Sequence, residues 1–131
     1  MNIMTQEVSY DVRISVETFY HSREEKSEDT AYNFAYRITI ENHCTHDIQL
    51  LRRMWYILDS HMELREVGGE GVVGQQPIIP SGSSYKYISG VDFLTEIGMM
   101  WGTYTMADLE SSALFEVEVP EFTMMTPWLS N

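Results

Sequence analysis

The chain has 131 residues, of which 44% are hydrophobic, and this length fits one globular domain over residues 1–131. Eight lysines and arginines oppose twenty aspartates and glutamates, giving a formal net charge of -12 at pH 7. A field of that sign repels phosphate backbones and anionic lipids, so we expect no nucleic-acid partner. We also expect no membrane insertion, because no apolar run approaches the ~20 residues that a spanning helix needs.

The first residues and the cysteine content favour a cytoplasmic protein. Residues 1–7 are polar and lack the basic-then-apolar layout of a signal peptide. Cys44 is the only cysteine, so the chain can form no internal disulfide. A lone thiol is compatible with a reducing compartment.

Apolar and polar residues alternate with a period of two near the start of the chain, which is typical of half-buried β-strands. The first run covers residues 8–17 and the second covers residues 32–41. Both are rich in the β-branched and aromatic residues that strands favour. Residues 21–30, between the two runs, are dense in Glu, Lys, Ser and Asp, and we interpret them as a solvated loop.

Later strands are short and bounded by turn residues. We expect them at residues 50–59, 64–67, 85–89, 98–106 and 114–119. The second of these should pair back on the first as a hairpin, and Pro120 should end the last. Met100, Tyr104 and Met106 share one side of their strand. No stretch shows the 3.6-residue period of a helix.

Seven or eight such strands predict an all-β sandwich or small barrel. We place the core of the domain at about residues 8–122. Residues 123–131 form a short C-terminal tail that is too apolar to fray in solvent. We expect this tail to pack on the sandwich or on a neighbouring subunit, which leaves a homodimer open.

Gly69, Gly71 and Gly74 match the spacing G-x-G-x-x-G, which holds a dinucleotide when a helix opens directly after it. Two of the next six residues are prolines, which exclude that helix. Two interpretations remain. The glycines supply positive φ and close backbone approach, or the N–H groups of the loop form an anion site. Glu70 and the net charge favour the structural interpretation.

His43, Cys44 and His46 place possible metal ligands in one polar turn. A structural zinc site usually takes four such donors in two separated pairs, and His21 and His61 lie far off in sequence. We therefore expect neither a tightly held metal nor a cofactor. The chain has no G-x-S-x-G motif, and one cysteine near histidines is not a nucleophile signature, so we expect no enzyme.

Met99, Met100 and Trp101 form an apolar run inside a predicted strand. Neighbours along a strand point to opposite faces, so one of Met100 and Trp101 must point outward. An exposed aromatic and methionine patch indicates a protein contact, although such residues more often belong to a core. We take Met100, Trp101 and, from the apolar tail, Trp128 as the interaction candidates.

Nearly the whole chain resembles the ApaG family, also called domain-of-unknown-function family 525. The matching segments are residues 34–42 (FAYRITIEN), 53–59 (RMWYILD), 69–77 (GEGVVGQQP), 80–82 (PSG), 87–90 (YISG), 102–106 (GTYTM) and 115–122 (FEVEVPEF). The combination G-V-V-G-x-Q-P is specific, whereas its glycines alone are not. Gly68 stands where the family often has a basic or amide residue, which weakens any anion binding by the loop.

The resemblance implies an immunoglobulin-like, fibronectin-III-like β-sandwich without established catalytic residues. We expect a stand-alone bacterial member, because 131 residues leave no room for an attached domain. The resemblance implies that such members are associated with cobalt/magnesium efflux. The same domain in eukaryotic F-box proteins and in a DNA-polymerase-interacting protein would serve protein contacts. We therefore expect a non-enzymatic module that binds another protein. The alternative is a protein responsive to a small anion or divalent ion, through residues 69–74 or the acidic surface.

Overall fold

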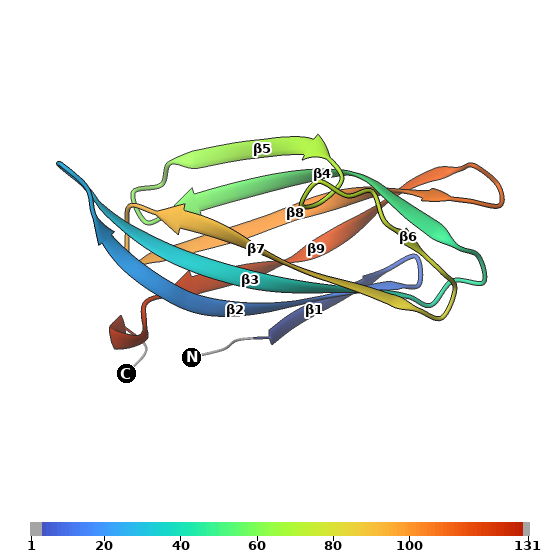
Figure 1. Ribbon diagram of the computed structural model, residues 1–131, viewed down its shortest axis with the longest axis horizontal. Helices are drawn as coiled ribbons and strands as arrows, with labels where there is room; N and C mark the ends of the chain where they lie inside the picture. Colours follow the sequence, from blue (N-terminus) through green and yellow to red (C-terminus); the bar gives the residue numbers. More distant parts are fainter. Residues whose placement is uncertain (1–3, 130–131) are drawn as a thin grey trace.

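The computed structural model describes residues 4–129, which form two antiparallel sheets packed face to face (Figure 1). The strands are β1 (Met4–Ser9), β2 (Val12–Glu25), β3 (Thr30–Asn42), β4 (Ile48–Asp59), β5 (Leu64–Glu70), β6 (Ile78–Ile79), β7 (Ser84–Phe93), β8 (Ile97–Asp108) and β9 (Leu114–Met125). The only helical segment in residues 4–129 is the 3-10 turn η1 (Pro127–Leu129), and no helix there could cross a membrane. The all-β prediction is confirmed.

Sheet A has the strand order β1-β2-β3-β7, and sheet B has the order β5-β4-β8-β9 with β6 paired to β4. The chain crosses between the sheets from β3 to β4, from β6 to β7 and from β7 to β8, as immunoglobulin-like sandwiches do. On one side β1 meets β9, where Ser9 Oγ accepts a hydrogen bond from the Glu118 N–H at 3.2 Å. On the other side β7 and β5 are the edge strands, and the glycine loop lies between the sheets there.

Trp55 lies at the centre of the core between the sheets and is 4% exposed. Its ring meets three others edge to face, at centroid distances of 5.7 Å for Tyr36, 6.0 Å for Tyr104 and 6.0 Å for Phe122. Gly102 is the direct partner of Trp55 on the neighbouring strand β8. A Cβ at Gly102 would lie 3.0 Å from the indole and 2.1 Å from the Met54 carbonyl oxygen. The missing side chain at Gly102 therefore makes room for the central tryptophan.

The first predicted strand, residues 8–17, is wrong as a single element. Tyr10 and Asp11 have φ values of 52° and 62°, and they form a two-residue turn between β1 and β2. Positive φ at both central residues is what the type I′ hairpin turn requires. Val8 and Tyr10 are therefore exposed and do not belong to the core, although they continue the alternation seen in the sequence.

The predicted loop at residues 21–30 is also wrong, because β2 and β3 continue through most of it as one long hairpin. Its tip projects past the rest of the sandwich (Figure 1). Both faces of the hairpin meet solvent there, so no alternation marks it in the sequence. Polar pairs hold it instead, with Glu25 Oε1 accepting from Arg23 Nη2 at 2.6 Å and Glu25 Oε2 accepting from Thr30 Oγ1 at 2.9 Å.

Two further boundaries differ from the prediction. Strand β9 does not end at Pro120 but runs to Met125, because the pairing between β8 and β9 shifts at this point and Pro120 lies in the irregular stretch. Proline is tolerated at such bulges and on edge strands, where no ladder hydrogen bond is lost. Gly68 and Gly69 belong to β5, which shortens the glycine loop to residues 71–74. The predicted hairpin of β4 and β5 is confirmed.

Replacing Gly102 should test the central packing. Gly102→Ala should destabilise the fold by about 1–3 kcal/mol, because the added Cβ meets backbone that cannot yield without moving β4. Each kcal/mol should lower the melting temperature by roughly 3–6 °C. The control is Gly90→Ala on β7, where the nearest atom to a new Cβ is the Phe34 carbonyl oxygen at 3.4 Å. Equal melting of both variants would contradict this account of the core.

Candidate functional site

The two central strands of sheet B present aromatic and apolar side chains on the outer face of the sandwich. Tyr56 on β4 and Trp101 on β8 are direct partners, and their rings stack with centroids 5.7 Å apart and planes at 16°. Met54 lies in the next row on one side, and the partners Leu58 and Met99 lie in the next row on the other. Each of the five is at least partly exposed. We call Met54, Tyr56, Leu58, Met99 and Trp101 the apolar stripe.

Of the two neighbouring candidates in β8, Trp101 is the one that points outward. Met100 is 1% exposed and belongs to the core, so it is not a surface contact. Met100 shares the buried side with Tyr104 and Met106, as the sequence predicts. The exposed partner that the sequence analysis missed is Tyr56. Its signal is the continuous apolar run at residues 54–58, which predicts a strand apolar on both faces.

Carboxylates border the apolar stripe on both edge strands of sheet B. Glu66 on β5 is the direct partner of Tyr56. On β9, Glu118 is the partner of Thr103, and Glu121 lies in the irregular stretch beside Trp101. All three glutamates are exposed. An apolar surface with an acidic border on both sides results.

The apolar stripe ends in a hollow of about 260 Å³ beside Leu58 and Met99. Met62, in the turn after β4, and Thr123, on β9, form part of its wall. Met62 has a φ of 64° and is 75% exposed, so this turn holds a flexible apolar side chain at the rim. The hollow is large enough to accept one apolar side chain from a partner.

The three glycines of the predicted loop have three different surroundings. Gly71 has a φ of 64°, and a Cβ there would lie 2.0 Å from the Gln75 carbonyl oxygen. Gly74 has a φ of 75° with open space around it. Gly69 is in β5, where a Cβ would lie 3.1 Å from the guanidinium nitrogens of Arg53. Positive φ and close approach therefore explain these glycines without a ligand.

Hydrogen bonds within the protein engage the loop's backbone. The Gly71 N–H donates to the Leu51 carbonyl at 2.8 Å, and Val72 and Gln75 exchange N–H···O bonds of 2.8 and 2.9 Å. Arg53 Nη1 donates to the Gly71 carbonyl at 2.8 Å. An anion-binding nest needs successive N–H groups directed at the ligand. At Gly71, Val72 and Gln75 these donors are directed at carbonyls instead.

A second hollow, of about 200 Å³, lies under the glycine loop between the sheets. Arg53, Tyr36, Tyr87 and Ser89 line it. Burial raises the pKa of both Tyr36 and Tyr87, and the Tyr87 hydroxyl is hydrogen-bonded to that of Tyr104, whose pKa burial also raises. These phenols stay neutral at physiological pH. They can donate hydrogen bonds but do not act as bases near pH 7.

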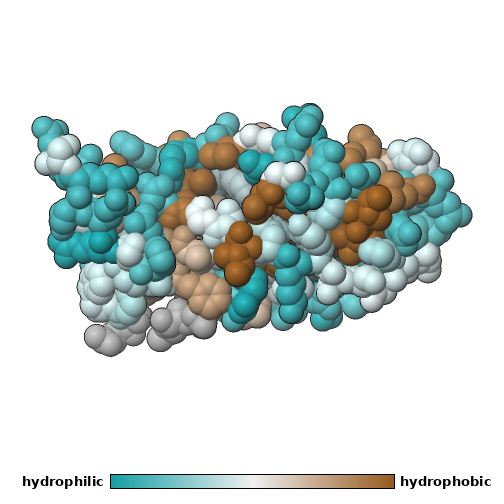
Figure 2. Space-filling view, viewed as in Figure 1, coloured by the Kyte–Doolittle hydropathy of each residue, from teal (hydrophilic) through white to brown (hydrophobic). Residues whose placement is uncertain are grey.

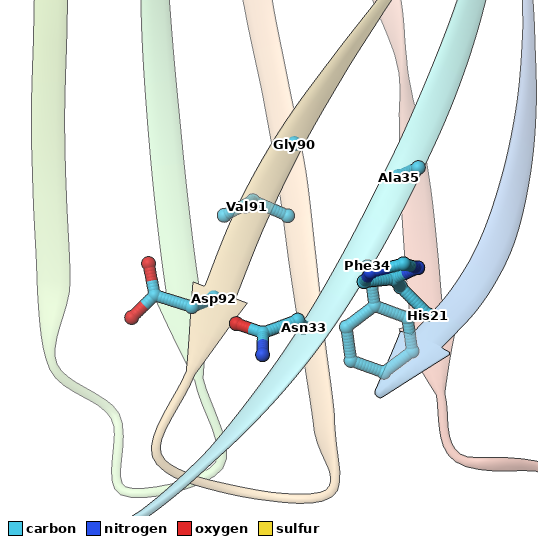
Figure 3. Close-up of a pocket in the computed structure, with 7 residues that line it drawn as sticks. All are labelled: His21, Asn33, Phe34, Ala35, Gly90, Val91 and Asp92. Atoms are coloured by element: carbon cyan, nitrogen blue, oxygen red, sulfur yellow. The ribbon is translucent and has the colours of Figure 1, made fainter. Parts of the chain in front are cut away.

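A shallow groove of about 390 Å³ crosses the outer face of sheet A (Figure 3). Ala35 on β3 and Gly90 on β7 are direct partners and leave the floor of the groove almost without side chains. Asn33 and Asp92 are partners in a neighbouring row (Figure 3). The groove is thus a depression left by two small residues on the outer face of sheet A.

His46 is held by carboxylates on both ring nitrogens. Its Nδ1 is 3.0 Å from Asp108 Oδ2, and its Nε2 is 2.7 Å from Glu110 Oε2. The hydrogen bond with Asp108, and then the charges of Glu110, Asp108 and Asp47, raise the pKa of His46. When both nitrogens donate to these carboxylates, the ring is a cation and has no lone pair to offer to a metal.

His43 and Cys44 point to separate partners. His43 Nε2 is 3.3 Å from Glu41 Oε1, and Cys44 Sγ donates to the Tyr10 carbonyl at 3.3 Å. Burial, followed by the charges of Asp11 and Asp108, raises the pKa of the Cys44 thiol. The thiolate is both the nucleophile and the metal ligand, so this environment disfavours both roles. Within residues 4–129 no three His, Cys, Asp or Glu side chains are grouped to hold a metal ion, and the expectation of no tightly held metal stays a prediction.

The C-terminal tail folds back on its own sandwich. Trp128, in η1, packs edge to face on Tyr20 with centroids 5.6 Å apart and lies 6.5 Å from the Tyr32 ring. Its Nε1 donates to the Glu96 carboxylate. Trp128 is still 47% exposed, so part of its ring remains available for contact. The last two residues of the predicted tail, 130–131, and the first three residues of the chain lie outside the described residues.

The fold and these surfaces define a small immunoglobulin-like β-sandwich with an aromatic outer face. The family model of the ApaG domain matches residues 22–108, and the chain belongs to the ApaG family. It is 43% identical to Protein ApaG of Proteus mirabilis, covering 94% of this chain and 98% of that protein. It is 39% identical to Protein ApaG of Brucella suis, covering 95% of both chains. These names state no catalytic activity.

A solved structure supports the same fold. The crystal structure of a putative ApaA protein from Bordetella pertussis superposes with a TM-score of 0.82 at 38% identity, covering 90% of this chain and 95% of that chain. A second X-ray structure, of a structural-genomics target, gives a TM-score of 0.88 at 39% identity, covering 91% of this chain and 89% of that one. The family resemblance and the sandwich that it implies are therefore confirmed.

Alanine variants of the glycine loop should lose stability without any ligand present. Gly74→Ala should cost roughly 1 kcal/mol from the positive φ alone, or about 3–6 °C of melting temperature. Gly71→Ala should cost more, because its Cβ also collides with the Gln75 carbonyl. Glu70→Ala is the matched control and should melt like the wild type. Unchanged melting in both glycine variants would remove the structural account of the motif.

The His46 contacts should stabilise the fold at acidic pH and not at alkaline pH. The folded-state pKa lies above the ordinary value of 6.5, so the stabilisation is complete below 6.5 and is lost as the pH rises through the raised pKa. His46→Gln should therefore lower the melting temperature at pH 5.5 and have little effect at pH 9. His61→Gln, in the turn after β4, is the control and should show no such difference between the two pH values.

The stabilisation contributed by Asp108 depends on pH in the opposite direction. The hydrogen bond from His46, followed by backbone N–H donors, lowers the pKa of Asp108 to about 2. The ionised Asp108 carboxylate therefore stabilises the fold fully above pH 3.8, the ordinary pKa of an aspartate, and this stabilisation is lost as the pH falls through about 2. If the His46→Gln effect grows towards pH 9, the ion pair is assigned wrongly.

Proposed function

We propose that this protein is a cytoplasmic, non-enzymatic module that binds another protein through the apolar stripe of sheet B. The observation that carries the proposal is the stacked pair of Tyr56 and Trp101 on a solvent-facing sheet. Aromatic residues and methionine are enriched at protein interfaces. A small number of interface residues, often aromatic, supplies most of the binding energy.

The arrangement around the stack supports a protein ligand over a small one. The apolar stripe is a surface of five side chains from two strands, with one hollow at its end. Small molecules bind in concave sites that enclose most of their surface, whereas proteins dock on broad faces. Several apolar groups separated by polar ones mark the face that Figure 2 displays, so surface hydrophobicity alone does not single out the site. The stacked rings of Tyr56 and Trp101, together with the glutamates on both sides of the apolar stripe, do single out the site.

The cobalt/magnesium association that the family resemblance implies fits this proposal as an effect passed through the partner. A specific magnesium site needs about six converging oxygens. The glutamates beside the apolar stripe are spread along two edge strands, β5 and β9, on opposite sides of the sheet. In this proposal the chain therefore contributes to metal tolerance by binding a protein.

Capture from native cytosol tests the proposal. The immobilised chain should retain one protein in stoichiometric amount, both with and without added Mg²⁺ and Co²⁺. Trp101→Ser should lose that protein while melting close to the wild type, because Trp101 lies outside the core. Ile88→Ser is the matched control, since Ile88 is 58% exposed on the outer face of sheet A.

Three results would count against the proposal. Retention of no protein would remove it. Retention only in the presence of metal would favour the ion-responsive alternative. Equal loss of the captured protein by Trp101→Ser and Ile88→Ser would show that the apolar stripe is not the contact.

A further inference from the structure

We infer that the apolar stripe receives an amphipathic helix whose apolar side is flanked by lysine or arginine. This inference rests on the proposed function and adds the chemistry of the partner. It follows from the width of sheet B, from the position of its carboxylates and from the hollow at one end.

The width of the sheet matches a helix. Adjacent strands lie about 4.8 Å apart, so β5 and β9 are separated by about 14 Å across the four strands of sheet B. A helix with its side chains is about 10–12 Å wide. A helix lying along β4 and β8 would cover the apolar stripe and place its two flanks over β5 and β9.

Carboxylates stand where those flanks would arrive. Glu66 lies beside Tyr56 on the β5 side, and Glu118 and Glu121 lie on the β9 side near Trp101. A lysine or arginine on each flank of the helix could reach one of these groups across the rim. One row beyond Met54, at the end of the apolar stripe opposite the hollow, Arg52 on β4 is the direct partner of Glu70 on β5. This end of the stripe therefore carries a basic group of the chain.

The length of the stripe sets the number of anchor residues. Met54 and Leu58 are four strand positions apart, or about 13 Å at 3.3 Å per residue. A helix covers that distance in about nine residues, which is two and a half turns. Anchors at positions i, i+4 and i+7 would then lie on Met54, on the Tyr56–Trp101 stack and at Leu58 with Met99. The hollow of about 260 Å³ beyond Leu58 would take the last anchor side chain.

The negative charge of the chain favours a basic helix over a second copy of the chain, nucleic acid or an anionic membrane as the occupant of the apolar stripe. A second copy of the chain would bring the same glutamates of β5 and β9 against each other, and like charges across an interface cost several kcal/mol. The net charge of -12 repels nucleic acid and anionic membranes. A partner with basic flanks gains from the same field, which also speeds its association at low salt.

Calorimetry with the full chain and three synthetic peptides of about 18 residues tests the inference. The first peptide is helical, with leucine and tryptophan on one side and lysine on both flanks. The second replaces each lysine by glutamate. The third has the composition of the first in a scrambled order that spreads the apolar residues around the helix. The first should bind with micromolar affinity at low salt, and the other two at least tenfold more weakly.

Variants of the chain locate the binding. Trp101→Ser should weaken binding of the lysine peptide by about tenfold or more. The double variant Glu66→Gln with Glu121→Gln should weaken it several-fold at low salt, and less at 1 M salt, where screening removes most of the difference. The matched control is Glu24→Gln with Glu28→Gln, which removes the same charge from the far end of the β2–β3 hairpin. Melting curves show whether each variant is folded.

Each contrary result has a definite meaning. Equal binding of the lysine and glutamate peptides, equal loss in both double variants, or no binding of any peptide would overturn the helical basic partner. Sedimentation that shows a dimer, converted to monomer by Trp101→Ser, would assign the stripe to a second copy. If cytosolic capture depends on Trp101 while the lysine peptide does not bind, the protein-binding function stands and this inference fails. If capture retains nothing, the function itself fails.

Discussion

The packing of the Trp55 indole over Gly102 determines how both faces of sheet B are used. Because neighbours on a strand point to opposite sides, an inward Trp55 directs Tyr56 outward, and an inward Gly102 directs Trp101 outward. The direct pairing of Trp55 with Gly102 also makes Tyr56 and Trp101 direct partners, so their rings can stack. A shift of one residue in β4 would exchange the core and surface sets. The aromatic outer face is therefore a geometric consequence of how the core closes.

Much of the fold can be predicted from the sequence, because burial on one side imposes a period of two. Residues 12–16 and 34–40 show this period, and their inward members are buried. The pattern fails where that cause is absent. At the far end of the β2–β3 hairpin, residues 23–29 are polar and exposed, and no buried side imposes a period there. The alternation also continues through Tyr10, although a turn there reverses the chain. Pattern alone does not distinguish a strand that continues from one that turns back in register.

The candidate site is less accessible to sequence reasoning, since it depends on which strands become neighbours. Alternation predicts that Trp101 or Met100 points outward, but only the pairing of β4 with β8 brings Trp101 onto Tyr56. The glycine loop shows the same limit. Residue type permits the positive φ of Gly71 and Gly74 but does not dictate it, since Gly69 lies in the regular strand β5, and the hydrogen bond from Arg53 to the loop needs the tertiary structure. Burial within the loop needs the tertiary structure as well, since Val72 is buried and its neighbour Val73 is 59% exposed.

The edge strands of the two sheets affect how readily a protein with an apolar outer face aggregates. Strand β9 carries Pro120, which has no N–H to offer to an added strand, and β1 lies against it. On the opposite side, Arg65 Nη2 donates to the Asp92 carbonyl of β7 at 2.7 Å and occupies part of that edge. Open strand edges are where sheets of separate molecules join into aggregates. By interrupting its edges, this sandwich can expose a hydrophobic face and resist growth into polymers when it is crowded.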